Sequence, residues 1–473
     1  MKPTLTFLTA LLLASLSFSG FAAAEAVPLN EREARRSPEW VTGGVMYQIQ
    51  ARAFTPEGTL RAATARLPKV AELGVDIIYL CPVFMADDDP NILGWSPRQK
   101  KSGMNNPRNP YRMKDYYHVD PEYGTDDDLK EFIATAHTLG MRVLLDMVYL
   151  HCGPNAVFLE EHPDFVKRDE AGKIVVAGWG WPAINFANPE LREYLWKNME
   201  HWVRNFGADG FRTDVSDGIP LDFWETARDR LEKIRPGQIC MLAEGTRRED
   251  QLKAFDLNYD WDLDYGSGLK SDNAAKLRAR WESMRDERPR GGARFIRFID
   301  NHDIANDSYD NRIEKVWGTR RVNATLVALF TLDGVPMLYN GQEVADTARH
   351  SIFGRAPIDW ANGDTPAGQT RFAFCKQLCA MRHAERALTH GEVVWLDNDQ
   401  PDSVLSFLRR TASEEILSVV NVSHRPTKVR VTFPERIGWS GDTLLADGAK
   451  AETGDSGFLV NLDGFGHLVA KRK

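Results

Sequence analysis

The stretch Ala208-Asp209-Gly210-Phe211-Arg212-Thr213-Asp214 follows a predicted helix, residues 190–206, that ends at Gly207. We expect it to form a strand, in which residues two apart point to the same face, so that Arg212 and Asp214 lie side by side. A neighbouring cation favours the ionised form of a carboxyl group and lowers its pKa. An ionised carboxylate held in this way is suited to act as a nucleophile. From this stretch alone, an Arg–Asp ion pair with a purely structural role is the alternative interpretation.

The same succession of helix, glycine and strand recurs along the chain. Strands are predicted at residues 45–50, 75–80, 141–146, 208–214, 239–243, 254–258, 293–299 and 335–338, and helices at residues 126–139, 190–206, 223–234 and 322–332. Strands such as residues 75–80 are mostly apolar on both faces, which is typical of a buried parallel sheet. Eight such units predict an α/β fold, a (β/α)8 TIM barrel with its helices outside, over residues 40–385.

Two regions depart from this alternation. Residues 152–185, after the third strand, are rich in Gly, Trp and charge, and they predict a small lobe inserted over one end of the barrel. Beyond residue 387 the chain predicts short strands with turn residues between them, at residues 393–396, 403–408, 416–422, 427–433 and 458–462. This pattern indicates a C-terminal β-sandwich domain, residues 387–473.

The composition limits the partners of the protein. The 473 residues include 59 basic and 67 acidic side chains, a net charge of −8. Nucleic acids and anionic membranes require a basic face, so neither is an expected partner. The 13 Trp, 12 Tyr and 23 Phe residues serve core packing or stacking against sugar rings or bases.

Residues 1–26 are predicted to be a signal peptide. Lys2 is followed by a largely apolar run, residues 5–21, and by small residues that offer cleavage after Ala24 or Ala26. A transmembrane anchor is the alternative, but the run is short and interrupted by polar residues. We therefore expect export to the periplasm or beyond.

The cysteines do not indicate a disulfide framework. They are scattered and odd in number, and we expect buried free thiols at Cys81, Cys152, Cys240, Cys375 and Cys379.

The candidate functional residues follow the predicted strands. In a closed α/β barrel the active site lies at the carboxyl ends of the strands. Each residue there has an ordinary alternative role, as a solvated acid, a structural histidine or a helix cap. Together, however, three carboxylates, two histidines and an arginine at one end of the barrel predict a catalytic site. All the strand-end positions considered are Arg52, Asp146, His151, Arg212, Asp214, Glu244, Asn301, His302, Asp303, Gln342 and Glu343.

Two of these carboxylates have the spacing expected of a glycosidase. Asp214 and Glu244 follow adjacent predicted strands, and carboxyl groups on neighbouring strands can approach the ~5–5.5 Å of a retaining glycosidase. Glu244 has no adjacent cation in the sequence, so we expect a raised pKa and an acid/base role, whereas Asp214 should stay charged. Asp303, beside His302, is suited to holding sugar hydroxyls and stabilising positive charge at the anomeric carbon.

Four short motifs around these residues resemble those of the α-amylase family of glycoside hydrolases (family 13). They occur in the family's order and read DMVYLH (146–151), GFRTD (210–214), AEG (243–245) and FIDNHD (298–303). Supporting matches are GVDIIYLCPVF (74–84), YRMKDYYHVDPEYGT (111–125) and GVPMLYNGQE (334–343), so the resemblance spans residues 45–383.

The resemblance implies a double-displacement mechanism, with retention, on α-linked oligo- or polysaccharides. It assigns the nucleophile to Asp214, the acid/base to Glu244 and the transition-state stabiliser to Asp303. The implied substrate-binding residues are Tyr111, His151, Arg212 and His302, with structural support from Asp146, which would orient Arg212, and Asn301.

Two departures from the family pattern bear on metal and substrate. Many members have a calcium-ligating Asn where this chain has Leu150, so no cofactor is expected to be required and a structural calcium site is doubtful. Asp217-Gly218 replaces the Lys-His of many starch endo-amylases, which weakens that assignment. Trp95, Trp179 and Trp181 are candidate sugar platforms.

Other functions remain open at this point. A transglycosylase would use the same residues, and it differs only in whether a sugar hydroxyl or water reaches the covalent intermediate. A non-catalytic carbohydrate-binding relative would be expected to lack a catalytic acid, and all three acids are present. A metal-dependent barrel hydrolase would need clustered His and Asp ligands on early strands, and the sequence offers none.

Overall fold

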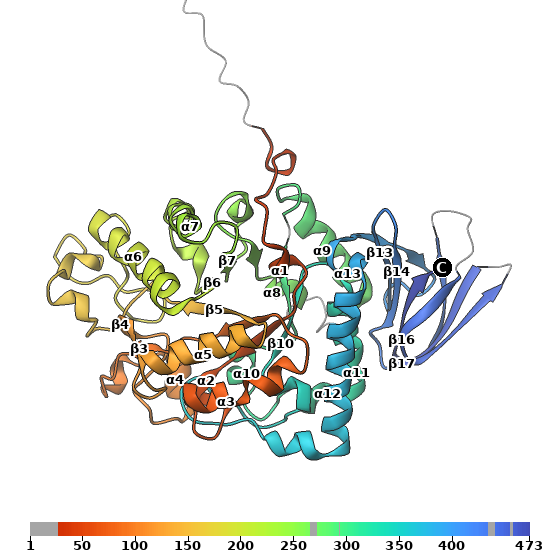
Figure 1. The fold of residues 1–473 in the computed structure, drawn as a ribbon, viewed down its shortest axis with the longest axis horizontal. Helices are drawn as coiled ribbons and strands as arrows, with labels where there is room; N and C mark the ends of the chain where they lie inside the picture. Colours follow the sequence, from red (N-terminus) through yellow and green to blue (C-terminus); the bar gives the residue numbers. More distant parts are fainter. Residues whose placement is uncertain (1–26, 265–271, 293, 434–439, 455–456) are drawn as a thin grey trace, which may run out of the picture.

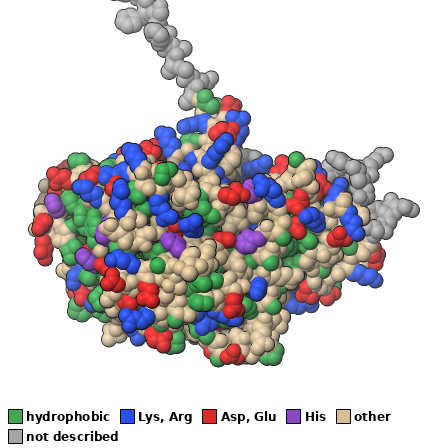
Figure 2. Space-filling view, in the orientation of Figure 1, with side chains coloured by type: hydrophobic (Ala, Val, Ile, Leu, Met, Phe, Trp, Pro, Cys, Tyr) green, Lys and Arg blue, Asp and Glu red, His purple; other side chains and the backbone are tan. Residues whose placement is uncertain are grey.

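The computed structural model describes residues 27–264, 272–292, 294–433, 440–454 and 457–473. The predicted signal peptide, residues 1–26, lies outside this part of the chain. None of the helices within it has the length and apolar character needed to cross a membrane. On the face seen in Figure 2, acidic and basic side chains are interspersed.

Eight parallel strands form the predicted barrel. Hydrogen bonds join them in the order β8-β7-β6-β5-β2-β1-β10-β9, and a parallel bridge between Asn258 and Phe295 links the two outer strands. The strands are β1 (Met46–Ile49), β2 (Ile77–Leu80), β5 (Arg142–Met147), β6 (Gly210–Thr213), β7 (Cys240–Ala243), β8 (Leu257–Asn258), β9 (Ile296–Arg297) and β10 (Val335–Tyr339). All eight predicted strands are therefore present, although residue 293 of the seventh lies outside the described residues.

The helices surround this sheet (Figure 1). The long ones are α3 (Leu60–Ala71), α5 (Asp126–Thr138), α6 (Pro189–Phe206), α7 (Leu221–Ile234), α9 (Ala274–Asp286), α11 (Ile313–Thr331) and α12 (Pro366–Ala384). Short helices are α1 (Glu39–Thr42), α2 (Ala51–Phe54), α4 (Pro97–Ser102), α8 (Trp261–Asp264), α10 (His302–Ser308) and α13 (Arg386–His390). The buried residues of α6 fall at helical spacing on the face that packs against the strands.

Local sequence sets the ends of the helices that lead into the site. Asn188 caps α6 by accepting hydrogen bonds from the first-turn amides, and Pro189 occupies the first helical position. Gly207 ends the helix in a left-handed conformation, as glycine at this position commonly does. The chain then turns directly into β6, which places Arg212 at the carboxyl end of the barrel.

In two connections of the barrel, local structure was not predicted from the sequence. An antiparallel pair, β3 (Phe84–Ala86) and β4 (Met113–Val119), extends the connection after β2. The insert between β5 and α6 contains short 3-10 turns and isolated bridges, one of which joins His151 to Ala183.

The C-terminal domain is an antiparallel sheet of seven strands: β11 (Glu392–Trp395), β12 (Asp397–Asn398), β13 (Val404–Arg410), β14 (Glu415–Asn421), β15 (Thr427–Thr432), β16 (Gly441–Gly454) and β17 (Gly457–Arg472). The long β17 pairs with β15 over its first half and with β14 over its second half. Strand β16 was missed from the sequence because its Gly, Ala and charged residues do not alternate in hydrophobicity.

Alternate residues of the inner strands attach this domain to the barrel. Phe407 and Ile416 belong to the barrel's hydrophobic core, whereas Leu408 and Leu417 belong to the core of the C-terminal domain. The strands β13 and β14 are therefore buried on both faces, and α11 packs against β14 and β17 (Figure 1).

The strand that carries Arg212 requires glycine at position 210. Gly210 has φ +152°, and a β-carbon there would overlap the carbonyl oxygen of Cys240 on the paired strand. We predict that Gly210→Ala lowers the free energy of unfolding by more than about 2 kcal/mol, because a fixed backbone atom must move. Thermal and urea unfolding measure this change. Gly178→Ala, where a β-carbon meets no atom within 4 Å, is the matched control, and equal stability of the two variants would contradict the argument.

Candidate active site

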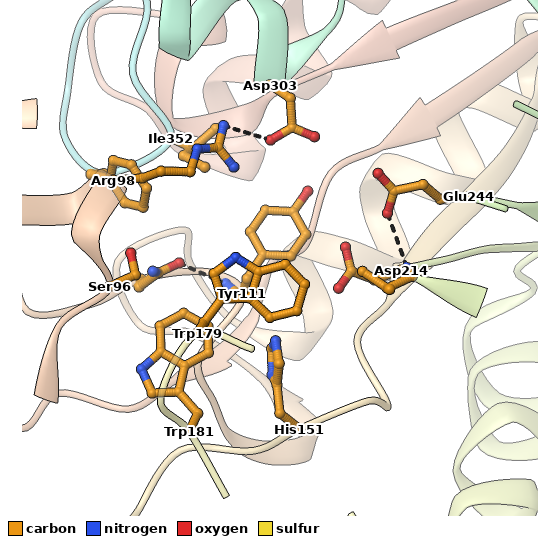
Figure 3. Close-up of a pocket in the computed structure, with 13 residues that line it drawn as sticks. Ser96, Arg98, Tyr111, His151, Trp179, Trp181, Asp214, Glu244, Asp303 and Ile352 are labelled. Carbon is orange, nitrogen blue, oxygen red and sulfur yellow. Dashed lines mark hydrogen bonds and ion pairs between the residues drawn. The ribbon is translucent and has the colours of Figure 1, made fainter. Parts of the chain in front are cut away.

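A cavity opens at the carboxyl ends of the strands (Figure 3). Five of the residues predicted for the site line it: Tyr111, His151, Asp214, Glu244 and Asp303. Residues from the connecting segments complete the lining: Ser96, Arg98, Asn109, Val215, Ile352, Phe353 and two tryptophans of the insert, Trp179 and Trp181. The structure thus brings together side chains from positions 96 to 353 at one end of the barrel.

The guanidinium of Arg212 lies at the centre of the carboxylates. Its Nη1 donates to Asp146 Oδ1 at 2.7 Å and to Asp214 Oδ1 at 2.8 Å, and its Nη2 lies 2.7 Å from Glu244 Oε2. The Arg212 side chain is fully buried. The predicted pairing of Arg212 with Asp214 and its orientation by Asp146 are therefore both observed.

Glu244 has no adjacent cation in the sequence, but the structure places one beside it. Arg212 reaches it from the neighbouring strand, because Arg212 is paired with Leu242, two residues before Glu244. A backbone amide also holds the carboxylate: Val215 N donates to Glu244 Oε2 at 3.0 Å. Val215 adopts φ +43°, which is unusual for a β-branched residue.

Burial, rather than the neighbouring cation, dominates the pKa of both carboxyl groups. Burial raises the pKa of Glu244 to about 8, and Arg212 offsets only part of this effect. Burial also raises the pKa of Asp214 to about 6. Arg212 lowers it, as expected, but offsets only part of the effect of burial, so the net shift is upward. Glu244 still has the higher pKa of the two, which is the order predicted for an acid/base and a nucleophile.

Asp303 differs from the other two acids. Burial raises its pKa, but nearby positive charge more than compensates and lowers it to about 2. The guanidinium of Arg98 lies 2.8 Å from Asp303 Oδ1. Asp303 is therefore the carboxylate of the cavity that remains ionised over the widest pH range.

The ring of His302 packs against Tyr111, which lines the cavity. Their rings stack with centroids 5.6 Å apart, and Tyr111 Oη lies 2.5 Å from His302 Nε2. Gln48 Nε2 lies 2.9 Å from His302 Nδ1, so His302 is neutral and carries its proton on Nε2. Burial lowers the pKa of His302 to about 4, in agreement with the neutral form.

His151 lies against the insert. Its ring makes edge-to-face contacts with Trp179 and Trp181, at centroid distances of 5.3 and 4.8 Å. Burial lowers its pKa to about 4, so it is neutral and can exchange hydrogen bonds with a sugar hydroxyl. Both tryptophans line the cavity, as predicted, whereas Trp95 is buried behind it and donates to Asp89 O.

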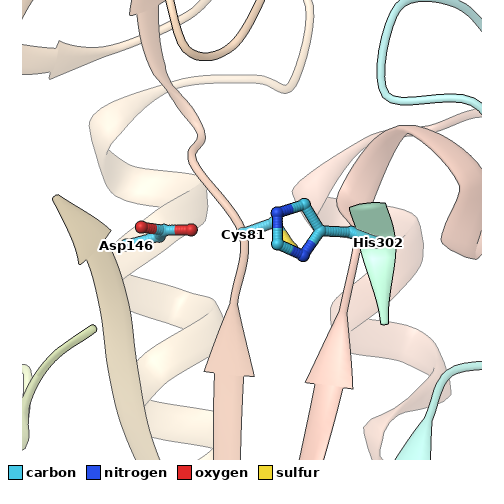
Figure 4. A group of neighbouring side chains, drawn as sticks. All are labelled: Cys81, Asp146 and His302. Carbon is cyan, nitrogen blue, oxygen red and sulfur yellow. The ribbon is translucent and has the colours of Figure 1, made fainter. Parts of the chain in front are cut away.

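Cys81, Asp146 and His302 form a buried group of possible metal ligands at the base of the cavity (Figure 4). Asp146 already accepts hydrogen bonds from Tyr79, Tyr111 and Arg212, and both ring nitrogens of His302 have partners. A cation here would also lie beside the Arg212 guanidinium. This donor set supports the catalytic groups and does not fit a metal ion.

Three predicted strand-end candidates lie away from the cavity. Arg52 pairs with Glu122, and Gln342 accepts a hydrogen bond from Tyr339 N. Glu343 lies within hydrogen-bond distance of Tyr47 Oη and Gly341 N. Asn301 caps α10 by accepting from Ile304 N, which is the supporting role assigned to it.

The two departures at Leu150 and Gly218 are in contact. A β-carbon at Gly218 would lie 2.8 Å from Leu150 Cδ1, so the leucine occupies the space beside this glycine. Asp217 turns the other way, and its carboxylate accepts from the amides of Thr246 and Arg247 in the loop after Glu244. Leu150 offers no oxygen, so the residue at this position does not fit a calcium ion.

The chain is similar in sequence to known proteins of the α-amylase type. The family model of the α-amylase catalytic domain matches residues 30–171. A cyclomaltodextrinase of Geobacillus thermopakistaniensis is 25% identical over 92% of this chain and 78% of its own length. The intracellular maltogenic amylase of Bacillus subtilis is 25% identical over 82% of this chain and 70% of its own length.

Solved structures share the fold along most of the chain. A maltogenic α-amylase of Thermotoga neapolitana superposes with a TM-score of 0.74 at 26% identity, covering 91% of this chain and 96% of its own. An α-amylase of Lactobacillus plantarum gives a TM-score of 0.76 at 24% identity, covering 92% and 100%. The matched family model and these relatives together support membership of the chain in the α-amylase family of glycoside hydrolases, family 13, and the four motifs lie at one end of this barrel.

Proposed function

We propose that this α-amylase-type enzyme is exported and hydrolyses α-glucans or maltooligosaccharides by double displacement, with retention at the anomeric carbon. The observation that supports this proposal most directly is the sharing of one guanidinium, that of Arg212, by Asp214 and Glu244. Two carboxyl groups held side by side suit the close pair of a retaining enzyme.

In the first step, Asp214 attacks the anomeric carbon while Glu244 donates its proton to the glycosidic oxygen, and the C–O bond to the leaving sugar breaks. The raised pKa of Glu244 keeps this proton available near neutrality. In the second step, Glu244 accepts a proton from water, whose oxygen attacks the same carbon and releases Asp214. Asp303, ionised throughout, stabilises the positive charge that develops on the sugar ring in both steps.

The neutral groups of the cavity position the sugar. His151 and Tyr111 offer hydrogen-bonding groups without a full charge, which suits hydroxyl ligands, and the neighbouring tryptophans offer apolar ring faces. The relatives named above as a cyclomaltodextrinase and a maltogenic amylase act on glucans, which supports this substrate class. Export rests on the predicted signal peptide, residues 1–26.

Transfer to a sugar hydroxyl instead of water is the second candidate function, because it uses the same catalytic groups. A product profile on maltooligosaccharides, pullulan, cyclodextrins and sucrose separates the two. Products longer than the substrate would indicate transfer, and proton NMR of fresh product would show the α-anomer if configuration is retained.

Substitution of the two carboxyl groups tests their roles. We predict that Glu244→Gln lowers kcat for maltooligosaccharides by about 10²–10⁴-fold because no proton reaches the leaving group, and that Asp214→Asn is at least as impaired. Glu244→Gln should retain most of its activity on α-glucosyl fluoride, whose leaving group needs no protonation. Glu249→Gln, an exposed acid of the same loop, serves as control. Normal activity of either folded variant on maltooligosaccharides would exclude the assignment.

The two raised pKa values predict a bell-shaped pH dependence of kcat/KM. The nucleophile must be ionised, so activity falls as pH drops below about 6, the pKa of Asp214. The acid must be protonated, so activity falls as pH rises above about 8, the pKa of Glu244. Initial rates on a maltooligosaccharide from pH 4 to pH 10 measure both limbs. A profile whose alkaline limb lies below pH 6 would contradict the acid/base role.

We further propose that the fold does not depend on a calcium ion. Leu150, which stands at the position of the family's calcium-ligating Asn, packs against Gly218. The neighbouring loops are held by direct hydrogen bonds. A ligand that binds the native state raises stability, so removing one that is absent changes nothing. We predict equal melting temperatures in excess EDTA and in millimolar calcium. A marked loss of stability in EDTA would reveal a cation site elsewhere in the protein.

A further inference from the structure

The wall of the cavity that faces Asp214 and Glu244 contains a single arginine. Arg98 projects from the short helix α4 on the side opposite Asp214 and Glu244 (Figure 3). It is the one Lys or Arg among the described residues that line this cavity. No motif of the sequence pointed to it.

Two acids on one helix face fix the position of the Arg98 guanidinium. Its Nη2 lies 2.8 Å from Asp303 Oδ1 and 3.0 Å from Asp307 Oδ1, and its Nε donates to Asp307 Oδ1 at 3.0 Å. Asp303 and Asp307 are four residues apart on α10, so both present their carboxylates to the same side. Two carboxylates thus hold the guanidinium in place, which reduces the side-chain entropy lost on contact with a substrate.

The surrounding loops hold this wall in place. Ser96 caps α4 by accepting from Gln99 N, and Arg349 Nη2 donates to the carbonyl of Ser102 at the other end of the helix. Beside Arg98, the amide of Ile352 donates to Asn306 Oδ1 on α10. The wall therefore joins α4, α10 and the segment after β10, rather than resting on one exposed loop.

The location of Arg98 defines which part of a sugar it meets. The anomeric carbon of the bound glucosyl unit must lie between Asp214 and Glu244, and the 4-hydroxyl lies across the pyranose ring from that carbon. In an α-1,4 chain this oxygen carries the next glucose toward the non-reducing end. A group on the opposite wall therefore occupies the path of any further glucose unit.

We propose that Arg98 determines specificity for chain ends: it donates to the terminal sugar hydroxyls beside Asp303 and blocks continuation of the chain beyond that sugar. The inference rests on the proposed hydrolysis of α-glucans and adds the direction from which the substrate enters. The substrate is then the non-reducing end of an α-1,4-glucan. An anionic substrate is not indicated, since two carboxylates already balance the guanidinium.

The experiment compares two forms of maltoheptaose labelled at the reducing end with 2-aminobenzamide, one with a free non-reducing end and one blocked there by a 4,6-O-benzylidene group. We predict that the wild-type enzyme cleaves the free form at least about a hundredfold faster in kcat/KM. Arg98→Ala should reduce this ratio at least about tenfold by opening the wall, whatever its effect on the absolute rate.

Arg349→Ala is the matched control, because it also removes an arginine that holds α4 but does not line the cavity. Its ratio should equal that of the wild type. If Arg98→Ala does not fold, Asp307→Asn releases one anchor of the guanidinium without touching the substrate, and it should lower the ratio to a smaller extent.

The outcomes separate this inference from the function on which it rests. Equal cleavage of both substrates by the wild type overturns the role of Arg98 and leaves hydrolysis intact. An unchanged ratio in a folded Arg98→Ala or Asp307→Asn variant overturns it as well. No cleavage of either substrate overturns the proposed function, and the inference with it.

Discussion

One buried guanidinium contacts three carboxyl groups, and the protonation of the site follows from this excess of acids over positive charge. Arg212 contacts Asp146, Asp214 and Glu244, and the rings of Tyr79 and Tyr259 lie within 6 Å of its charged carbon. A single positive charge cannot stabilise three ionised acids away from water, so the least stabilised acid keeps its proton. Burial raises the pKa of Glu244 above those of the other two, and the retained proton is the one that the chemistry needs.

Unfavourable backbone conformations at Gly210 and Val215 accompany the contacts of Arg212 with the three acids. Strand β6 approaches β7 so closely that position 210 admits no side chain, and Val215 adopts a left-handed conformation immediately after Asp214. Both features bring adjacent strand ends together, which lets one arginine reach acids on three neighbouring strands. Such conformations persist only where the surrounding structure compels them, and they are concentrated at functional sites.

The fold and most of the site could be predicted because regular strands place their last residues at one edge. Asp146, Arg212 and Asp214 each end a buried strand, and their meeting follows from parallel pairing. The residues from connecting segments, such as Ser96, Arg98 and Phe353, could not be predicted, because the path of a loop depends on tertiary contacts that no periodicity records. The net shift in the pKa of Asp214 could not be predicted, because the sequence shows that Arg212 is near but does not show that Asp214 is buried.

The residues that depart from the family pattern compensate for one another. Leu150 removes an oxygen where other members bind calcium, and the absent side chain of Gly218 leaves room for the leucine. The adjacent Asp217 turns back onto the amides that follow Glu244, and Ser216 donates to the Glu244 carbonyl. The loop after Asp214 thus supports the loop after Glu244. Asp217 faces that loop and is absent from the described lining of the cavity, so the charged residue opposite Asp214 and Glu244 that is placed to discriminate between substrates is Arg98.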